Sequence, residues 1–283
     1  MRLPPLTVFA ILVLLAGSRS GASPAVATAT APDGVRIAYA TDGTRRPALV
    51  FVHGWSCDRR YWSLQLQGFL KYYQVVGLDL AGHGESGSNR QQWTMAAFGG
   101  DVAAVVETLK LDKVVLIGHS MGGDVIAEAA RRLKGRVAGL IWVDTYKRLG
   151  TPRTDDALAA IMRPFRANFA ETTKQFVRGM FLPGADPALV TMVVDDMSSA
   201  PAEIAIGALE SALGYDREMP SALAELKLPV IAINPETPAT DLASMSKHGV
   251  EVIVMSDVGH FPMLEAPDRF NRLLRTAVEK IAR

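Results

Sequence analysis

The sequence predicts an α/β protein with a mostly parallel sheet flanked by helices and an inserted helical cap. From about residue 33, short β-branched apolar runs alternate with longer segments of helical period, which is typical of a parallel sheet covered by helices. From about residue 150 to 220 the strand pattern stops, and only helical segments with Pro and Gly breaks remain. We therefore expect a core of residues 28–145 and 221–283 and a cap of residues 146–220.

The first 27 residues have the features of a signal peptide. Met1 and Arg2 supply a short positive end, and an apolar run follows at residues 6–16. Ala25-Val26-Ala27 is the preferred cleavage site, and Ser20-Gly21-Ala22 is a weaker one. The apolar run is shorter than the roughly 20 residues that cross a bilayer. We expect export to the periplasm or the medium, with no stable membrane anchor.

The predicted elements of the core follow in order. Residues 35–40 indicate an antiparallel edge strand, with Asp42-Gly43 as its turn. Buried strands, apolar on both faces, are predicted at residues 49–52, 74–78, 114–117 and 139–143. The strand pattern resumes at residues 229–234 and 250–255. An amphipathic helix at residues 267–281 ends the chain. Polar residues follow several of these strands, where open α/β sheets bind their ligands.

Composition excludes several classes of function. Thirty basic and 29 acidic residues leave a formal net charge of +1, so nucleic acid is not an expected partner. Cys57 is the only cysteine, which rules out an intrachain disulfide, and it is expected to be a small buried residue. There is no H-x-x-x-H pattern or Cys/His cluster, so neither a metal nor another cofactor is implied. The sequence makes no prediction of oligomeric state.

The strongest chemical signal is the segment Gly118-His119-Ser120-Met121-Gly122, which lies between a predicted strand and a predicted helix. This is the G-x-S-x-G pattern of a nucleophile elbow. The turn forces its serine into a strained conformation, and the glycines two positions away let the strand and the helix approach closely. Ser120 is therefore the predicted nucleophile.

The chain resembles the α/β-hydrolase family from about residue 33 to its C-terminus. Besides the elbow, His53-Gly54-Trp55 looks like the oxyanion-loop motif of the family. Residues 79–86 are similar to its D-L-x-G-H-G-x-S segment, and residues 259–267 look like its catalytic-histidine loop. These motifs occur in the family's order, so the resemblance implies the fold and a hydrolytic triad.

The resemblance also implies roles for particular residues. A serine needs a neighbouring base, and His260 has the late position that the family gives to it. The backbone N–H groups of Trp55 and Met121 are the implied oxyanion donors, and the Trp55 ring is expected to be a pocket wall or a core residue. The other histidines are expected to have structural positions in loops, in the elbow and in a link: His53, His83, His119 and His248.

The triad acid departs from the usual family pattern. That pattern puts an aspartate shortly after the strand at residues 229–234, where this chain has Pro238. Asp144, at the end of the preceding strand, is the favoured candidate, as in some haloalkane dehalogenases and zearalenone-type lactonases. Glu236 is the alternative, and Asp241 is a third candidate. An aspartate at position 144 could also simply brace the cap hinge.

We expect the protein to hydrolyse a carboxylic ester or a lactone of a mainly apolar small molecule. Ser120 in place of an aspartate argues against a dehalogenase or an epoxide hydrolase. Other reactions on the same triad remain open, namely carbon–carbon bond hydrolysis, perhydrolysis and acyl transfer. A non-catalytic binding protein on this scaffold is a further alternative. The predicted cap is rich in residues that could form its core or an adaptable apolar pocket: Met162, Met180, Met192, Met197, Phe165, Phe169, Phe176 and Phe181.

Overall fold

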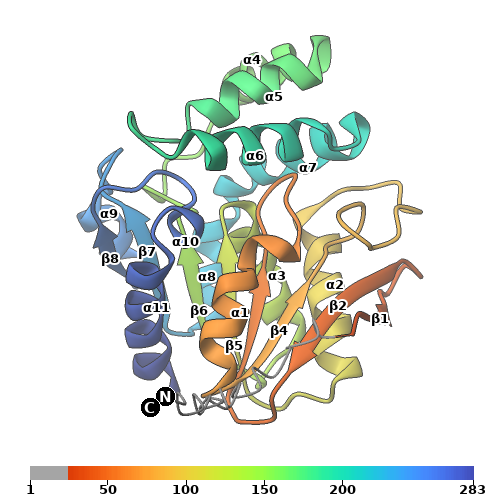
Figure 1. Ribbon diagram of the computed structural model, residues 1–283, viewed down its shortest axis with the longest axis vertical. Helices are drawn as coiled ribbons and strands as arrows, with labels where there is room; N and C mark the ends of the chain where they lie inside the picture. Colours follow the sequence, from red (N-terminus) through yellow and green to blue (C-terminus); the bar gives the residue numbers. More distant parts are fainter. Residues whose placement is uncertain (1–24) are drawn as a thin grey trace, which may run out of the picture.

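The computed structural model describes residues 25–283. The predicted signal peptide therefore lies outside the described residues except for its last three positions. Eight strands form one sheet in the spatial order β1-β2-β4-β3-β5-β6-β7-β8 (Figure 1). β1 and β4 both pair antiparallel with β2, and all other neighbours are parallel. The strands are β1 (Ala27–Thr30), β2 (Arg36–Asp42), β3 (Ala48–Val52), β4 (Gln74–Leu78), β5 (Val114–His119), β6 (Val137–Val143), β7 (Val230–Pro235) and β8 (Val250–Met255).

The parallel strands lie where the sequence predicted them. The predicted edge strand is present, but it is not at the edge of the sheet. The segment predicted at the edge is β2, and the prediction of its position was wrong because β1 pairs along its outer side, with Ala27 opposite Tyr39. β1 has only four residues, all Ala or Thr, and only Ala29 among them is buried. Such a segment lacks an apolar periodicity of its own, so its pairing with the next strand, β2, defines it.

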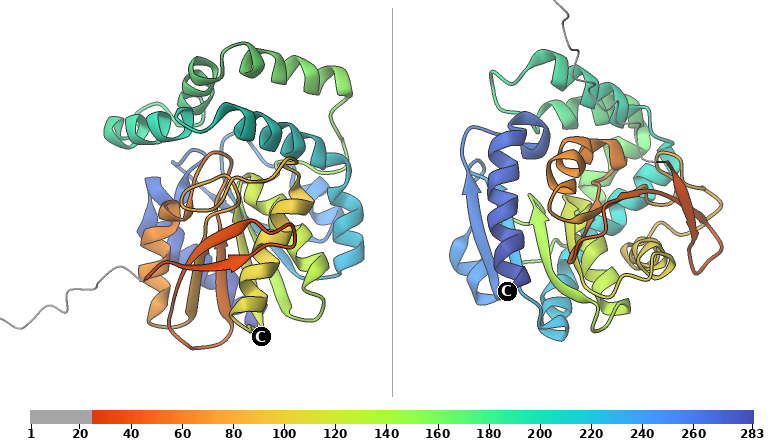
Figure 2. Two further views of the ribbon diagram at one scale, coloured as in Figure 1. Left: turned by 90° about the vertical axis from the view of Figure 1, so that its right-hand side faces the viewer. Right: turned by 60° about the horizontal axis from the view of Figure 1, so that its bottom comes forward.

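Two layers of helices cover the sheet. On one face α1 packs against α11, and on the other α3 lies between α2 and α8 (Figures 1 and 2). The shorter α9 packs against β8, and α10 precedes α11. These helices are α1 (Ser63–Leu70), α2 (Met95–Thr108), α3 (Met121–Arg132), α8 (Met219–Leu226), α9 (Leu242–Lys247), α10 (Pro262–Glu265) and α11 (Pro267–Ala282). Short 3-10 helices occur at Arg59–Trp62 and Tyr215–Arg217.

The segment between β6 and α8 forms the helical insert. Its four helices lie across the carboxyl ends of the parallel strands, so the insert covers that end of the sheet (Figures 1 and 2). They are α4 (Asp155–Ala167), α5 (Phe169–Arg178), α6 (Pro187–Ser198) and α7 (Ala202–Gly214). Each of α4, α5 and α6 begins with a side-chain cap, from Thr154, Asn168 and Asp186 respectively, which satisfies an otherwise free backbone N–H.

The core lies on both faces of the sheet. Every residue of β3 and β5 is buried, which explains why these strands read as continuous apolar runs. Trp62, Phe69 and Phe270 pack on one face and are fully buried. Among the helices of residues 25–283, none combines the length and the apolar composition needed to span a bilayer.

Candidate active site

The elbow holds Ser120 in a strained backbone conformation. Its φ is 51° and its ψ is −120°, which places a non-glycine residue in a region that costs on the order of 1–3 kcal/mol. A Cβ atom at Gly118 would lie 2.2 Å from the carbonyl oxygen of Gly122. A Cβ atom at Gly122 would lie 2.7 Å from the carbonyl oxygens of Val52 and His53. Both glycines are therefore required by backbone contacts, and the steric argument from the sequence is confirmed.

Strand pairing brings Ser120 and Asp144 together. His119 is the register partner of Val143, so the residues that follow them leave β5 and β6 side by side. The backbone N–H of Ser120 donates to the carbonyl of Val143 at 2.9 Å, which fixes the elbow against the end of β6. Ser120 also begins α3, so its side chain is close to the positive end of a helix.

Asp144 and His260 are directly hydrogen-bonded. Nδ1 of His260 lies 2.7 Å from Oδ2 of Asp144. This bond assigns the proton of a neutral imidazole to Nδ1 and leaves Nε2 as the basic nitrogen. The structure thus joins the predicted base to the favoured acid across 116 residues of sequence.

Lys147 is the second partner of the Asp144 carboxylate. Its Nζ lies 3.0 Å from Oδ1 of Asp144 and donates to the carbonyl of Pro235 at 2.8 Å. Burial alone raises the pKa of Asp144, but the hydrogen bond and charge of His260, aided by the charge of Lys147, lower the pKa below its ordinary value. Asp144 is therefore ionised at neutral pH. Lys147 is not among the site residues predicted from the sequence, although it lies three residues after a predicted strand-end acid.

The loop that carries His260 is held from two sides. The carboxylate of Glu265 accepts from the backbone N–H groups of Gly259 at 2.9 Å and Phe261 at 3.0 Å. From the insert, the carbonyl of Met180 accepts the backbone N–H of His260 at 2.9 Å. Glu265 belongs to the predicted catalytic-histidine loop at residues 259–267. The sequence did not indicate that its carboxylate holds that loop in place.

The remaining histidines have structural partners. His53 donates from Nδ1 to the carbonyl of Gly54 and accepts at Nε2 from the N–H of Leu80, at 2.8 and 3.0 Å. Nδ1 of His83 and of His248 likewise lie within hydrogen-bond distance of the carbonyls of Ala81 and Ser244. Burial lowers the pKa of His53 to about 4 and that of His83 to about 3, so both stay neutral.

His119 is closer to the chemistry than the sequence suggested. Its Nε2 donates to the carbonyl of His260 at 2.8 Å, and the two imidazole ring centres are 4.7 Å apart. Burial lowers the pKa of His119 to about 3, so a neutral ring lies beside the predicted base. A charged ring here would disfavour protonation of His260, and its neutrality removes that conflict.

One predicted oxyanion donor lies within the elbow, and the other lies in the loop after the neighbouring strand β3. Trp55 follows β3, which is the parallel neighbour of β5, and Met121 directly follows the predicted nucleophile. The Trp55 ring is 4% exposed, and its Nε1 donates to the carbonyl of Ala205 in α7 at 2.7 Å. The ring therefore both lines the cavity and fastens this loop to the insert.

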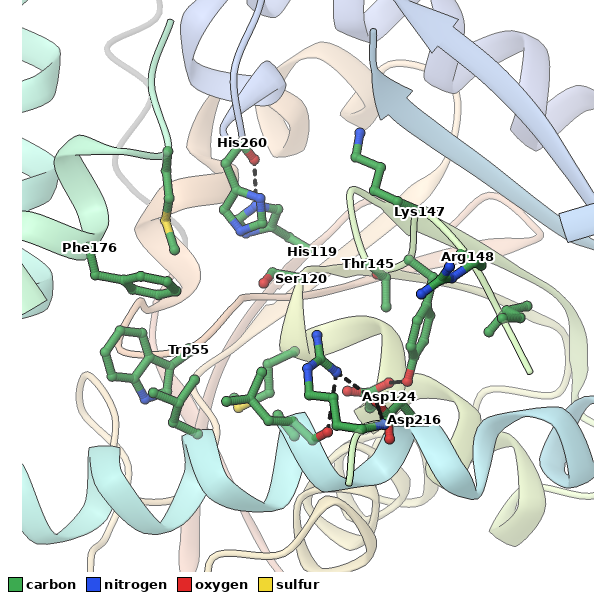
Figure 3. A pocket seen from close by; sticks show the side chains of 18 of the residues that line it. Trp55, His119, Ser120, Asp124, Thr145, Lys147, Arg148, Phe176, Asp216 and His260 are labelled. Atoms are coloured by element: carbon green, nitrogen blue, oxygen red, sulfur yellow. Dashed lines mark hydrogen bonds and ion pairs between the residues drawn. The ribbon is translucent and has the colours of Figure 1, made fainter. Parts of the chain in front are cut away.

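Ser120 and His260 line one cavity of about 670 Å³ between the sheet and the insert. Figure 3 shows both side chains facing this space, with Trp55 and Phe176 on one side and Lys147 and Arg148 on the other. A volume of this size suits a small organic molecule. No group of three or more His, Cys, Asp or Glu side chains within residues 25–283 is arranged to hold a metal ion.

The other candidates for the acid lie elsewhere. Glu236 is exposed, and its backbone N–H pairs with Met255 across β7 and β8. Asp241 lines the cavity, but its carboxylate caps α9 by accepting from the N–H of Ser244 at 2.9 Å. Of the described carboxylates, Asp144 alone is hydrogen-bonded to the His260 ring. Cys57 is buried, and burial raises the pKa of its thiol, as expected for an inert residue.

The predicted residues of the insert divide between core and cavity. Met162 and Phe165 are buried inside it. Phe176, Met180 and Met197 line the cavity. Met192 is exposed, and nothing in its surroundings assigns it a role.

Comparison with known proteins gives a consistent result. A model of the family described as the alpha/beta hydrolase family matches residues 49–273. Among solved structures, a thermophilic esterase from Thermogutta terrifontis superposes with a TM-score of 0.78 at 25% identity, covering 92% of this chain and 100% of its own.

Two curated relatives extend the comparison. The 3-oxoadipate enol-lactonase 2 of Acinetobacter baylyi is 25% identical over 262 residues, which cover 89% of this chain and 96% of that protein. The dihydrolipoyllysine-residue acetyltransferase component of the acetoin cleaving system of Cupriavidus necator is 29% identical over 259 residues. That match covers 86% of this chain but 66% of the relative, so this chain spans just under two thirds of the relative's length.

Proposed function

The chain belongs to the alpha/beta hydrolase family, and from this premise we propose that it hydrolyses a carboxylic ester or a lactone of a mainly apolar small molecule. One observation carries the proposal. Ser120 lies at a strained elbow and lines the same cavity as His260. Nδ1 of His260 is hydrogen-bonded to Asp144 at 2.7 Å, which leaves Nε2 free to act as the base. The names of the similar esterase and enol-lactonase also favour ester and lactone substrates.

The proposed reaction proceeds in two stages. Oγ of Ser120 attacks the carbonyl carbon while Nε2 of His260 takes its proton, and Asp144 stabilises the resulting imidazolium. The backbone N–H groups of Trp55 and Met121 are the proposed donors to the oxyanion. The intermediate then collapses, and the leaving alcohol takes the proton from His260. In the second stage His260 deprotonates a water molecule, which attacks the acyl carbon. The bond to Oγ of Ser120 then breaks, Oγ takes the proton back from His260, and the acid is released.

Hydrolysis of p-nitrophenyl butyrate tests this proposal. Ser120→Ala should lower kcat by a factor on the order of 10⁶, because the nucleophile is removed. Ser221→Ala is a matched control, since that serine is exposed on α8 and bonds only to the carbonyl of Glu218 in its own segment. Activity that survives in Ser120→Ala would disprove the mechanism. A fluorophosphonate label found by mass spectrometry on Ser120 would support it.

Acyl transfer to an acceptor other than water is the second candidate. It is favoured by the likeness to a protein named as an acetyltransferase component. Both reactions share the acyl-enzyme and differ in what attacks it. Adding a primary alcohol to the assay separates them, because a transferase would form the new ester in preference to the free acid.

We further propose that the chain is exported after removal of residues 1–27, as its N-terminal sequence predicts.

A further inference from the structure

The side chain of Trp55 is held by three helices of the insert. Its Nε1 donates to the carbonyl of Ala205 in α7 at 2.7 Å. Its ring also meets three phenylalanine rings edge to face, a favoured geometry of aromatic pairs, at centre-to-centre distances of 5.7, 6.1 and 6.1 Å. These are Phe165 of α4 and Phe169 and Phe176 of α5. The insert therefore fixes both the position and the tilt of the indole.

The backbone around Trp55 is tightly packed on one side and strained on the other. A Cβ atom at Gly54 would lie 2.8 Å from Nδ1 of His119, so this glycine is pressed against the elbow. Ser56 has a φ of 53°, in the left-handed region that few non-glycine residues adopt. Such a conformation persists only where the surroundings hold it. The contacts of the Trp55 side chain with the insert supply part of that support.

The backbone N–H of Trp55 is one of the two proposed oxyanion donors. Among the described residues it pairs with no backbone carbonyl. A donor lowers the barrier most when it is already aimed at the position where the oxyanion develops. A misplacement of about 1 Å can cost roughly 10²-fold in rate. Because the indole and this N–H belong to the same residue, a displacement of the ring also displaces the donor.

We propose that Trp55 is a positioning residue, through which the insert sets the direction of the Trp55 N–H toward the oxyanion. This inference rests on the proposed function and adds a role for the insert. Besides covering the cavity, the insert then acts on the rate of the chemical step. Side chains of the insert that do not touch the substrate contribute to turnover through their contacts with the indole.

Phe165 separates this role from contact with the substrate, because it is 3% exposed and does not line the described cavity. We expect Phe165→Leu to lower kcat for p-nitrophenyl butyrate by roughly three- to tenfold with KM within about twofold, because the oxyanion donor loses part of its support. Trp55→Phe also loses the hydrogen bond to Ala205. It should lower kcat further, by roughly tenfold to 10²-fold.

The double variant Trp55→Phe/Phe165→Leu tests whether Phe165 acts through Trp55. If it does, Phe165→Leu should change kcat of Trp55→Phe by less than about twofold, so the two losses do not multiply. Trp93→Phe is the matched control. Trp93 is also buried against α7, where a Cβ atom at Gly207 would lie 3.1 Å from its ring, but it does not line the described cavity. We expect it to leave kcat within about twofold of the wild type.

Butylboronic acid gives a readout that a merely structural role would not change. It forms a tetrahedral adduct with a serine hydroxyl, in which an oxygen takes the position of the oxyanion. Its inhibition constant should rise in Trp55→Phe and Phe165→Leu by about the factor by which kcat/KM falls, because both quantities report binding of the tetrahedral state. Thermal unfolding of each variant, compared with Trp93→Phe, checks that the fold is intact at the assay temperature.

Three outcomes would overturn the inference. They are an unchanged kcat in Trp55→Phe, a Phe165→Leu effect that is undiminished in the Trp55→Phe background, and an equal loss of kcat in Trp93→Phe. If Phe165→Leu does not fold, Phe169→Leu makes the same test from the half-buried ring on α5.

Failure of the wild-type protein to hydrolyse any ester overturns the proposed function instead. In that case calorimetric titration with butylboronic acid still decides the role of Trp55. Weaker binding to Trp55→Phe than to Trp93→Phe supports it, and equal binding refutes it.

Discussion

Nζ of Lys147 lies 3.0 Å from Oδ1 of Asp144, the carboxylate oxygen that does not accept the bond from His260. The same ammonium group donates to the carbonyl of Pro235 at the end of β7. The lysine thus ties the proposed acid to the neighbouring strand and fixes the plane of its carboxylate. Asp144 itself has a φ of 49°, which few non-glycine residues adopt.

We expect Lys147→Met to lower kcat for p-nitrophenyl butyrate by about tenfold with little change in KM, because the carboxylate loses one of the two groups that orient it. Lys174→Met is the matched control. Lys174 forms an ion pair with Glu171 at the same three-residue spacing, but on the exposed surface of α5. An unchanged kcat in Lys147→Met would show that His260 alone positions Asp144.

Asp144→Asn should lower kcat by roughly 10⁴, as for the aspartate of other serine triads, because the amide favours the wrong imidazole tautomer. Glu236→Gln provides the comparison, since Glu236 is exposed on the loop after β7. We expect it to leave kcat within about twofold of the wild type. Loss of activity in Glu236→Gln with retention in Asp144→Asn would reverse the assignment of the acid.

Asp124 should make stability depend on pH. Its pKa is about 8 in the folded protein and near 3.8 when unfolded, so the folded state holds the proton more tightly. The sign follows from linkage: its stabilising contribution is complete below pH 4 and is lost as the pH rises toward 8. The expected slope is up to about 1.4 kcal/mol per pH unit. Urea titrations between pH 4 and 8 should show this slope flattened in Asp124→Asn. Asp268→Asn, on the exposed face of α11, should not flatten it.

Gly118→Ala should destabilise the fold by several kcal/mol, because its Cβ atom would overlap the backbone oxygen of Gly122 at 2.2 Å. Gly214→Ala offers the contrast. Its Cβ atom would meet only a side-chain atom of Leu158 at 3.8 Å, and alanine favours the helix more than glycine does. Thermal unfolding should therefore show a large loss for the first variant and no loss for the second. Equal melting temperatures would contradict the steric account of the elbow.

N-terminal sequencing of protein recovered from the periplasm or medium tests export. We expect the mature chain to begin at Thr28, after the Ala25-Val26-Ala27 site. Such cleavage removes only the first residue of β1, so three residues of its pairing with β2 would remain. A recovered chain that still begins at Met1 would disprove the prediction.

The sequence predicted features that depend on local pattern. The buried parallel strands and the elbow follow from apolar runs and from glycine spacing, and the structure has them at those positions. Features that depend on tertiary pairing were harder to predict. β1 exists because β2 lies beside it, and the closeness of Lys147 to Asp144 depends on how the chain turns after β6. Asp124 could have been predicted to line the cavity, since a residue four positions after Ser120 lies on the same helical face. Asp216 could not, because only the packing of the insert brings it to the cavity.

The hydrogen bond from the N–H of His260 to the carbonyl of Met180 joins the insert, which covers the cavity, to the loop that carries the proposed base. The insert and this loop cannot separate at Met180 without losing that hydrogen bond or displacing His260. A ligand that displaces the insert near Met180 would therefore also displace His260 and disturb proton transfer. We therefore expect a bulky ligand that breaks this bond to be turned over slowly even where it binds well.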